Sequence, residues 1–275
     1  MKIAICLYGI SKKTDSRGIH INWRQSCRNI EQMLRGSHHD IDFFIHTWST
    51  SEKESLIRFF KPKGIMVESS KFPNYKHNLA DIKFGNTGHY DPDTKIQSIY
   101  SRWDSECKSI KLKREYETEN DFKYDFVLSR RFDLLFYEDF NYEDLDQNNF
   151  YSSNWHVFWK DDRRYFGYND AWFVSGTENM DRHSSIIDNL DHFLSVGSSY
   201  YNYMTRDLGF DKELILSNHA ISRYNLIHEG IIHNERFIGL EYETWNLVRK
   251  SNIRKNPHWT CPRDIAKPFN PEAHK

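Results

Sequence analysis

Two arginines and an aspartate follow one another where a buried strand is expected to end. The stretch YDFVLSRRFDLLFYEDF, residues 124–140, carries an apolar run that reaches Arg130 and Arg131, and Asp133 comes two positions later. Guanidinium groups match the oxygens of a diphosphate, and a carboxylate beside them suits a divalent cation that bridges the same phosphates. The stretch predicts a nucleotide-diphosphate site, with a surface ion pair among the three side chains as the alternative.

Asp170, in GYNDAWF, is the carboxylate placed best for acid–base chemistry. It precedes an apolar run beside an aromatic cluster, which suits a sugar-lined cleft. A sugar hydroxyl is a poor nucleophile until a base takes its proton, so Asp170 is the predicted catalytic base. The alternative is a turn residue that caps a strand. Asp161 and Asp162 are rival bases, for which a solvated, salt-linked loop is the favoured explanation.

The elements that must position these residues alternate along the chain. Short apolar runs predict strands over 2–8, 40–48, 64–70 and 124–130. Helical spacing of apolar residues predicts helices over 22–35, 51–62 and 95–119. This order predicts an α/β fold with a mainly parallel, Rossmann-type sheet flanked by helices. Residues 71–95, between the third strand and the long helix, are expected to form a loop.

The second half of the chain is dense in aromatic and charged residues. Short strands and loops are expected over 150–176, and a short strand over 229–234. Two further helices are expected over 175–194 and 211–226.

Ligands of an open α/β sheet bind beyond the carboxyl ends of its strands. After the first two strands these positions are Tyr8, Gly9, Ile10, His46, Thr47 and Trp48. Gly9 permits close backbone approach, and Tyr8 or Trp48 could stack on a base. Near the start of the long helix, hydrogen bonds to a uracil or ribose could come from Gln97, Ser98 and Arg102. A polar helix face is the alternative for these three.

The composition and the absence of certain motifs argue against several classes of protein. Lys and Arg number 38 against 39 Asp and Glu, so there is no broad positive field for nucleic acid. No apolar stretch is long enough to form a helix that spans a bilayer. The sequence contains no G-x-x-x-x-G-K-[ST], no G-x-G-x-x-G after the first strand and no G-x-S-x-G. P-loop, dinucleotide and serine-hydrolase chemistry are therefore not expected.

Cysteine and histidine spacing indicates no zinc site. The cysteines form no C-x-x-C pair, and Cys6 lies in a strand pattern where a buried free thiol is expected. The short apolar N-terminal run stops at Gly9 and favours a strand over a signal peptide. These features favour a cytoplasmic protein. His219, His228 and His233 are either ordinary histidines or completers of a cation site near the diphosphate.

Five blocks in order give the chain a resemblance to a known family. They are L-Y-G, FFIHTW, KIQSIYS, YDFVLSRRFDLLF and YNDAWFVSGTENMD, spread over residues 1–230. In this order they resemble small glycosyltransferases of bacterial surface-polysaccharide clusters and of large algal viruses, where one member transfers xylose to a capsid glycan. RFD at 131–133 stands where that family has a D-x-D metal motif, with Arg131 replacing the first carboxylate. One carboxylate holds Mg²⁺ or Mn²⁺ less firmly, so arginine could take over part of the cation's work.

The resemblance implies a GT-A type fold in one domain over 1–252. Its nucleotide-sugar-binding half would be 1–140 and its aromatic-rich acceptor half 141–252, followed by a polar tail over 253–275. The donor would be a UDP-sugar, UDP-xylose if the viral likeness is close, and the acceptor an oligosaccharide hydroxyl, with inversion.

The expected site residues follow from this assignment. Asp133 would bind the cation, with Arg130, Arg131 and Phe132 beside the nucleotide sugar. Trp155, Trp159 and Trp172 would stack on acceptor sugars, or else pack in the core. A non-catalytic carbohydrate-binding protein that uses its aromatic surface is the alternative function.

Overall fold

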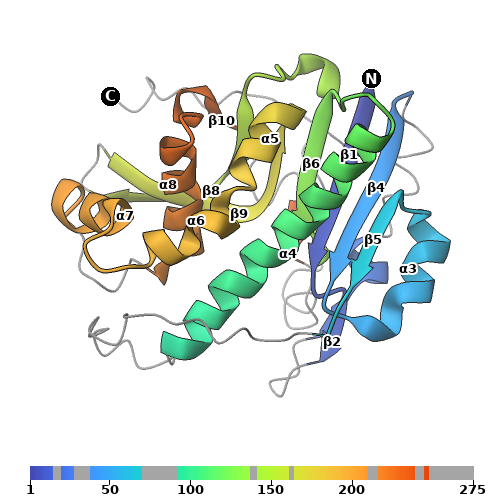
Figure 1. The fold of residues 1–275 in the computed structure, drawn as a ribbon, viewed down its shortest axis with the longest axis horizontal. Helices are drawn as coiled ribbons and strands as arrows, with labels where there is room; N and C mark the ends of the chain where they lie inside the picture. Colours follow the sequence, from blue (N-terminus) through green and yellow to red (C-terminus); the bar gives the residue numbers. More distant parts are fainter. Residues whose placement is uncertain are drawn as a thin grey trace, which may run out of the picture.

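A seven-stranded sheet is the centre of the fold (Figure 1). The computed structural model describes residues 1–14, 20–27, 38–69, 92–136, 141–160, 164–209, 216–238 and 245–247. The strand order is β10-β8-β9-β6-β1-β4-β5. The bounds are Lys2–Gly9 (β1), Asp40–Thr47 (β4), Gly64–Val67 (β5), Phe126–Arg131 (β6), Phe150–Lys160 (β8), Arg164–Ser175 (β9) and Glu235–Phe237 (β10).

Strand direction confirms the predicted α/β class and mainly parallel sheet. β5, β4, β1 and β6 pair in parallel, as do β8 and β10. Only β9 among these strands runs the other way, antiparallel to both β6 and β8. Two small antiparallel pairs lie outside this sheet: β2 (Lys12–Thr14) with β3 (His20–Asn22), and β7 (Leu134–Phe136) with β11 (Trp245–Leu247).

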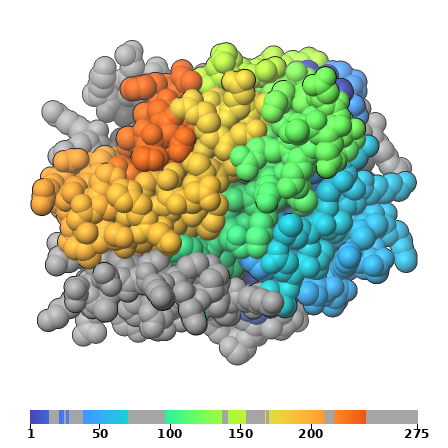
Figure 2. All heavy atoms as spheres, viewed as in Figure 1, coloured from blue at the N-terminus to red at the C-terminus, as the bar shows by residue number. Residues whose placement is uncertain are grey.

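Helices cover both faces of the sheet. They are α1 (Trp23–Ser26), α3 (Lys53–Phe60), α4 (Pro92–Glu119), α5 (Thr177–His183), α6 (Ile186–Phe193), α7 (Ser199–Asn202) and α8 (Asn218–His228). Short turns of helix are η1 (Thr50–Glu52), η3 (Tyr142–Asp144), η5 (Tyr203–Asp207) and η7 (Ile232–Asn234). The long helix α4 crosses one face of β1 and β4, and α5 and α6 pack beside it as a continuous surface (Figure 2).

Alternation along the strands divides the core into two apolar clusters. Cys6 and Val127 face α4 and contact the cluster that includes Trp103, whereas Leu7 and Leu128 face the opposite cluster. The second cluster includes Trp23 of α1. Cys6 is a buried free thiol, as predicted. The part of the chain that the structure describes has no helix both long and apolar enough to cross a membrane.

Several predicted elements differ from the observed ones. The helix predicted over 175–194 is two helices, α5 and α6, with Ser184 and Ser185 between them. The Ser184 Oγ donates to the Asp181 carbonyl at 2.7 Å, a local bond that competes with helix continuation. The strand predicted over 229–234 is wrong, since η7 occupies Ile232–Asn234 and β10 follows it. The short strands and loops expected over 150–176 are the long hairpin of β8 and β9.

Other predictions lie partly outside the described residues. The helix predicted over 22–35 is described only as α1, and the one over 211–226 only from its later part, α8, after the N-cap Ser217. Most of the predicted loop 71–95, and the tail 253–275, also lie outside them.

Candidate functional site

Parallel strands bring three predicted positions to one edge of the sheet. In the register of the central strands, Tyr8 lies opposite His46 of β4 and opposite Arg131 of β6. β9 runs the other way and pairs Trp172 with Arg130, so Asp170, two residues before Trp172, reaches the same edge. Asp170, the predicted catalytic base, therefore lies at the same edge of the sheet as the carboxyl ends of β1, β4 and β6.

Arg102, on α4, links the charged groups at this edge. Its Nε donates to Asp170 Oδ2 at 2.7 Å, and its Nη2 donates to the Tyr8 hydroxyl at 2.9 Å. Its Nη1 donates to Glu106, one turn further along α4, and Nη2 also reaches the Asp170 main-chain carbonyl. Glu106 is buried and accepts from the Ser129 hydroxyl at 2.5 Å. The Arg102 guanidinium is therefore fixed on two sides by carboxylates.

His219 contacts the other oxygen of Asp170. The distance from His219 Nδ1 to Asp170 Oδ1 is 3.3 Å, and 27% of the His219 side chain is exposed. His219 is in the first turn of α8, which Ser217 caps by accepting from the Ala220 N–H. The helix approaches β9 closely at Gly167, where an added Cβ would lie 2.8 Å from the His219 carbonyl carbon. Glycine at this position allows His219 to reach Asp170.

Buried charge sets the protonation of these carboxyls. Burial alone would raise the pKa of Asp170, but the positive charges of Arg102, His219 and Arg131 outweigh it and lower that pKa to about 2. Burial raises the pKa of Glu106, and Arg102 only partly offsets the effect. Asp170 is therefore ionised at neutral pH and is a weak proton acceptor by itself.

Arg131 and Asp133 form an ion pair beside Asp170. Arg131 Nη2 lies 2.6 Å from Asp133 Oδ2, with the Asp133 side chain 3% exposed and that of Arg131 25% exposed. Burial would lower the pKa of Arg131, but Asp133, Asp170 and Tyr8 together raise it. Arg131 is thus a permanent cation at the edge, with part of its side chain exposed.

Arg130 does not join this cluster. Adjacent strand residues point to opposite faces, and Arg130 is buried on the face away from α4. Its Nη2 donates to the Leu134 carbonyl, and its guanidinium carbon lies 4.6 Å from the centre of the Phe136 ring. Of the two arginines predicted to hold a diphosphate, Arg131 is partly exposed at this edge, whereas Arg130 is buried and a ligand could not reach it in this arrangement.

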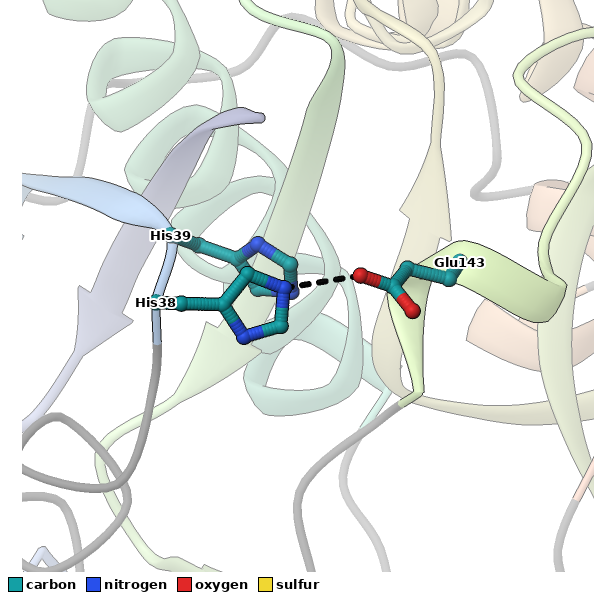
Figure 3. A group of neighbouring side chains, drawn as sticks. All are labelled: His38, His39 and Glu143. Atoms are coloured by element: carbon teal, nitrogen blue, oxygen red, sulfur yellow. Dashed lines mark hydrogen bonds and ion pairs between the residues drawn. The ribbon is translucent and has the colours of Figure 1, made fainter.

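The residues around Asp133 do not fit a resident divalent cation. Mg²⁺ and Mn²⁺ need several oxygen ligands, and Asp133 is a single buried carboxylate already paired with a guanidinium. Among the described residues, the side chains close enough to share a metal ion are His38, His39 and Glu143 (Figure 3). They lie at the opposite end of β4 from His46. His38 Nε2 and Glu143 Oε1, both on exposed residues, are 2.7 Å apart and form a hydrogen bond.

A second polar group lies at the end of β4. His46 is buried, and its Nδ1 is 2.6 Å from the Ser105 hydroxyl, which also accepts from the Gly9 N–H at 2.8 Å. Burial first, and then the charge of Lys108, lower the pKa of His46 to about 4. Gly9 has a φ of 95°, in the region that favours glycine. His46 and Ser105 thus hold the backbone turn at the end of β1.

Trp48 is the aromatic residue of this edge with a partly exposed side chain. Its ring meets the His46 ring edge-on, with centroids 4.6 Å apart, and Lys108 Nζ lies 5.1 Å from its centre. Thr47 is fully buried and donates to the Ser11 hydroxyl at 3.1 Å, so it holds the loop together. A base could stack on Trp48, whereas Thr47 is not placed to contact one.

The remaining predicted residues divide by exposure. Gln97 and Ile10 are half-buried and Ser98 is exposed. Phe132 is fully buried, and its backbone N–H donates to the Tyr8 carbonyl at 3.2 Å. Trp172 is 1% exposed and packs on Phe136, so its predicted stacking on an acceptor sugar is wrong. The side chains of Trp155 and Trp159 lie outside the described part of the chain.

Sequence reasoning missed two members of the cluster. Glu106 follows Arg102 by four residues, a spacing that places both on one helix face and signals the pair. Ser129, which donates to Glu106, precedes the two arginines in β6 and carried no such signal. Comparison of the chain with models of known protein families finds no match, and comparison with curated proteins finds none either.

Proposed function

We propose that this protein is a glycosyltransferase that moves a sugar from a UDP-sugar to a hydroxyl of a saccharide acceptor. The five sequence blocks support the assignment. The observation that carries it is the position of the Arg131–Asp133 pair, at the carboxyl edge of the sheet and beside the ionised Asp170. At this edge Arg131 could bind a diphosphate through its positive charge, and the carboxylate of Asp170 could lie beside a reacting hydroxyl.

The donor half of the site would use Arg131 and Trp48. A partly exposed guanidinium with a raised pKa keeps its charge when a phosphate arrives and can bind two oxygens at once. The side chain of Trp48 is partly exposed and could stack on uracil. Lys108 contacts the Trp48 ring and helps to hold it in place. Gly9, with open space where a Cβ would be, permits the nucleotide to approach the backbone.

The reaction places opposite electrostatic demands on the two sides of the sugar. The bond between the anomeric carbon and the diphosphate breaks, and UDP leaves with the electron pair and added negative charge. Arg131 would stabilise that charge, in a site where no cation need be invoked. The acceptor oxygen forms the new bond from the other face and loses its proton on the side of Asp170. Attack from that face would invert the configuration at the anomeric carbon.

Location follows from the donor. We place the protein in the cytoplasm, where nucleotide sugars are made. Cys6, Cys27 and Cys107 are buried free thiols, which is the usual state in a reducing compartment.

Calorimetry with UDP tests the proposal, with ADP as the control nucleotide. UDP should bind, ADP should bind more weakly, and Arg131→Met should weaken UDP binding by about tenfold or more, as expected for loss of a charged hydrogen bond. Arg206→Met, on η5, is the matched control. A second assay measures UDP released from a panel of UDP-sugars that includes UDP-xylose.

Two results would contradict the proposal. Failure of the wild-type protein to bind UDP would remove the donor. Binding of oligosaccharides without binding of UDP would instead indicate a non-catalytic carbohydrate-binding protein.

A further inference from the structure

The carboxylate of Asp170 is engaged on both of its oxygens. Arg102 Nε holds Oδ2 at 2.7 Å, and His219 Nδ1 lies 3.3 Å from Oδ1. The Asp170 side chain is 9% exposed, against 27% for His219. A substrate hydroxyl can therefore approach His219 more readily than it can approach Asp170.

Asp170 by itself is also poorly matched to proton abstraction. A general base works best when its pKa is near the operating pH. Arg102, His219 and Arg131 together overcome the effect of burial and lower the pKa of Asp170 to about 2. A neutral imidazole, by contrast, can accept a proton on one ring nitrogen while the N–H of the other faces a carboxylate.

We infer that His219 is the catalytic base that takes the proton of the acceptor hydroxyl, and that Asp170 is the residue that positions it. The inference rests on the proposed glycosyl transfer and adds a named base to it. A nucleophile's base is commonly oriented by a third group, and here Arg102 in turn fixes Asp170. The chain of contacts Arg102–Asp170–His219 draws on α4, β9 and α8.

The contact with Asp170 indicates which ring nitrogen of His219 carries the hydrogen and which one accepts the proton. With its hydrogen on Nδ1, the nitrogen that lies 3.3 Å from the Asp170 carboxylate, the neutral ring would leave Nε2 as the proton acceptor. In the reaction, Nε2 takes the hydroxyl proton as the acceptor oxygen bonds to the anomeric carbon. The bond to the diphosphate breaks, and UDP keeps its electron pair. The imidazolium formed is stabilised by ionised Asp170, and its proton then passes to solvent.

The charged groups around His219 are consistent with this role. From β9 it faces Asp170, and behind Asp170 lies Arg102 of α4. One turn further along α8, Arg223 Nη1 donates to the Tyr203 hydroxyl at 2.8 Å, and Arg223 Nε lies 3.9 Å from Glu235. Asp170 is the acidic group that the described structure places against the ring.

Variants of His219 test the inference in the full-length chain. His219→Asn and His219→Ala should bind UDP with the wild-type affinity, because the donor contacts Arg131 instead. UDP release from the UDP-sugar panel, with methyl glycosides as acceptors, should fall by about 10²–10⁴-fold, the usual contribution of a general base. Added imidazole should restore part of the activity of His219→Ala. His192→Ala, at an exposed histidine of α6, is the control and should keep full activity.

Turnover and UDP binding separate the two hypotheses. If His219→Asn binds UDP and releases it from donor within about threefold of the wild-type rate, far below a general-base effect, then His219 is not the base and the proposed function stands. If wild-type protein does not bind UDP, the proposed function fails and this inference fails with it.

A spectroscopic measurement tests the geometry without turnover. The ¹⁵N shifts of the His219 ring, assigned by comparison with His219→Asn, should show hydrogen on Nδ1 and none on Nε2 at high pH. Asp170→Asn should shift this tautomer balance while leaving UDP affinity unchanged. Hydrogen on Nε2 in the wild-type protein would overturn the assignment.

Discussion

Arg102 and Asp170 are joined by a hydrogen-bonded ion pair, Nε to Oδ2 at 2.7 Å, that ties the long helix α4 to the antiparallel strand β9. The Arg102 side chain is 10% exposed and that of Asp170 9%. The pair therefore lies almost out of water, where Glu106 completes the neutralisation of the guanidinium. The same contact fixes the predicted catalytic carboxylate and stabilises the join between the two halves of the sheet.

Replacing Arg102 with methionine should destabilise the protein strongly. It leaves Asp170 and Glu106 buried without their cation, and breaking a buried pair in this way costs about 3–5 kcal/mol. The measurement is urea unfolding at neutral pH. Arg114→Met, an exposed arginine of the same helix, is the control and should cost less than about 0.5 kcal/mol. Equal losses for the two variants would show that the buried pair contributes nothing.

Acid should remove the contribution of Asp170 to stability. The pKa of Asp170 in the folded protein, about 2, is below its ordinary value of 3.8, so the carboxylate stabilises the fold above pH 3.8 and the effect disappears as pH falls toward 2. The difference of nearly two pKa units corresponds to about 2 kcal/mol. The free energies of unfolding of wild type and Asp170→Asn should therefore converge over this pH range. A constant difference between them would mean that Asp170 has an ordinary pKa.

Alanine at position 167 should separate α8 from β9. Its Cβ would lie 2.8 Å from the His219 carbonyl carbon and 2.9 Å from the Ala220 nitrogen, and both are backbone atoms that cannot rotate away. We expect a loss of about 1–3 kcal/mol, together with reduced turnover and unchanged UDP affinity.

Gly64→Ala is the matched control for this substitution. There the nearest atoms are Leu112 Cβ at 3.1 Å and Phe44 Cδ1 at 3.3 Å, so the added methyl group is less crowded than at Gly167. Thermal unfolding and UDP calorimetry on both variants check the comparison. A smaller loss of stability in Gly167→Ala than in Gly64→Ala would contradict the close approach.

UDP binding should not depend on a divalent cation in the wild-type protein. Arg131 supplies the positive charge, and Asp133 is paired with it at 2.6 Å. Calorimetry in EDTA and in excess Mn²⁺ should give dissociation constants within about twofold, which is less than half a kcal/mol. Tighter binding with Mn²⁺ would show that a cation joins Asp133 in spite of the ion pair.

Arg131→Asp offers the converse experiment. The substitution would create D-F-D at 131–133 and replace the guanidinium with a second carboxylate, a better set of oxygen ligands. This variant should bind UDP only when Mn²⁺ is present. Arg131→Asn, which adds no charge, is the control and should bind UDP weakly in both conditions. Binding by Arg131→Asp without metal would argue against a role for Arg131 at the phosphates.

Periodicity predicted most of the elements that build the site. Strong apolar patterns specify β1, β4 and α4, and their ends placed Tyr8, His46 and Arg102 among the candidates. Asp170 was a candidate because it precedes an apolar run beside an aromatic cluster. The two adjacent arginines show where a local signal was overlooked, because a period of two already sends Arg130 and Arg131 to opposite faces. The choice of Arg131 for the site required knowing which face α4 covers.

The sequence by itself determined the α/β class, the parallel strands and the residue types gathered at their carboxyl ends, because these depend on local spacing and chain direction. Only the tertiary structure decided that Asp170 is held by Arg102, that Trp172 belongs to the core and that His219 completes the cluster. Those contacts join β9 to helices far away in the chain. Contacts of this kind depend on how α4 and α8 pack on the sheet, which a local pattern of residues in the sequence does not predict.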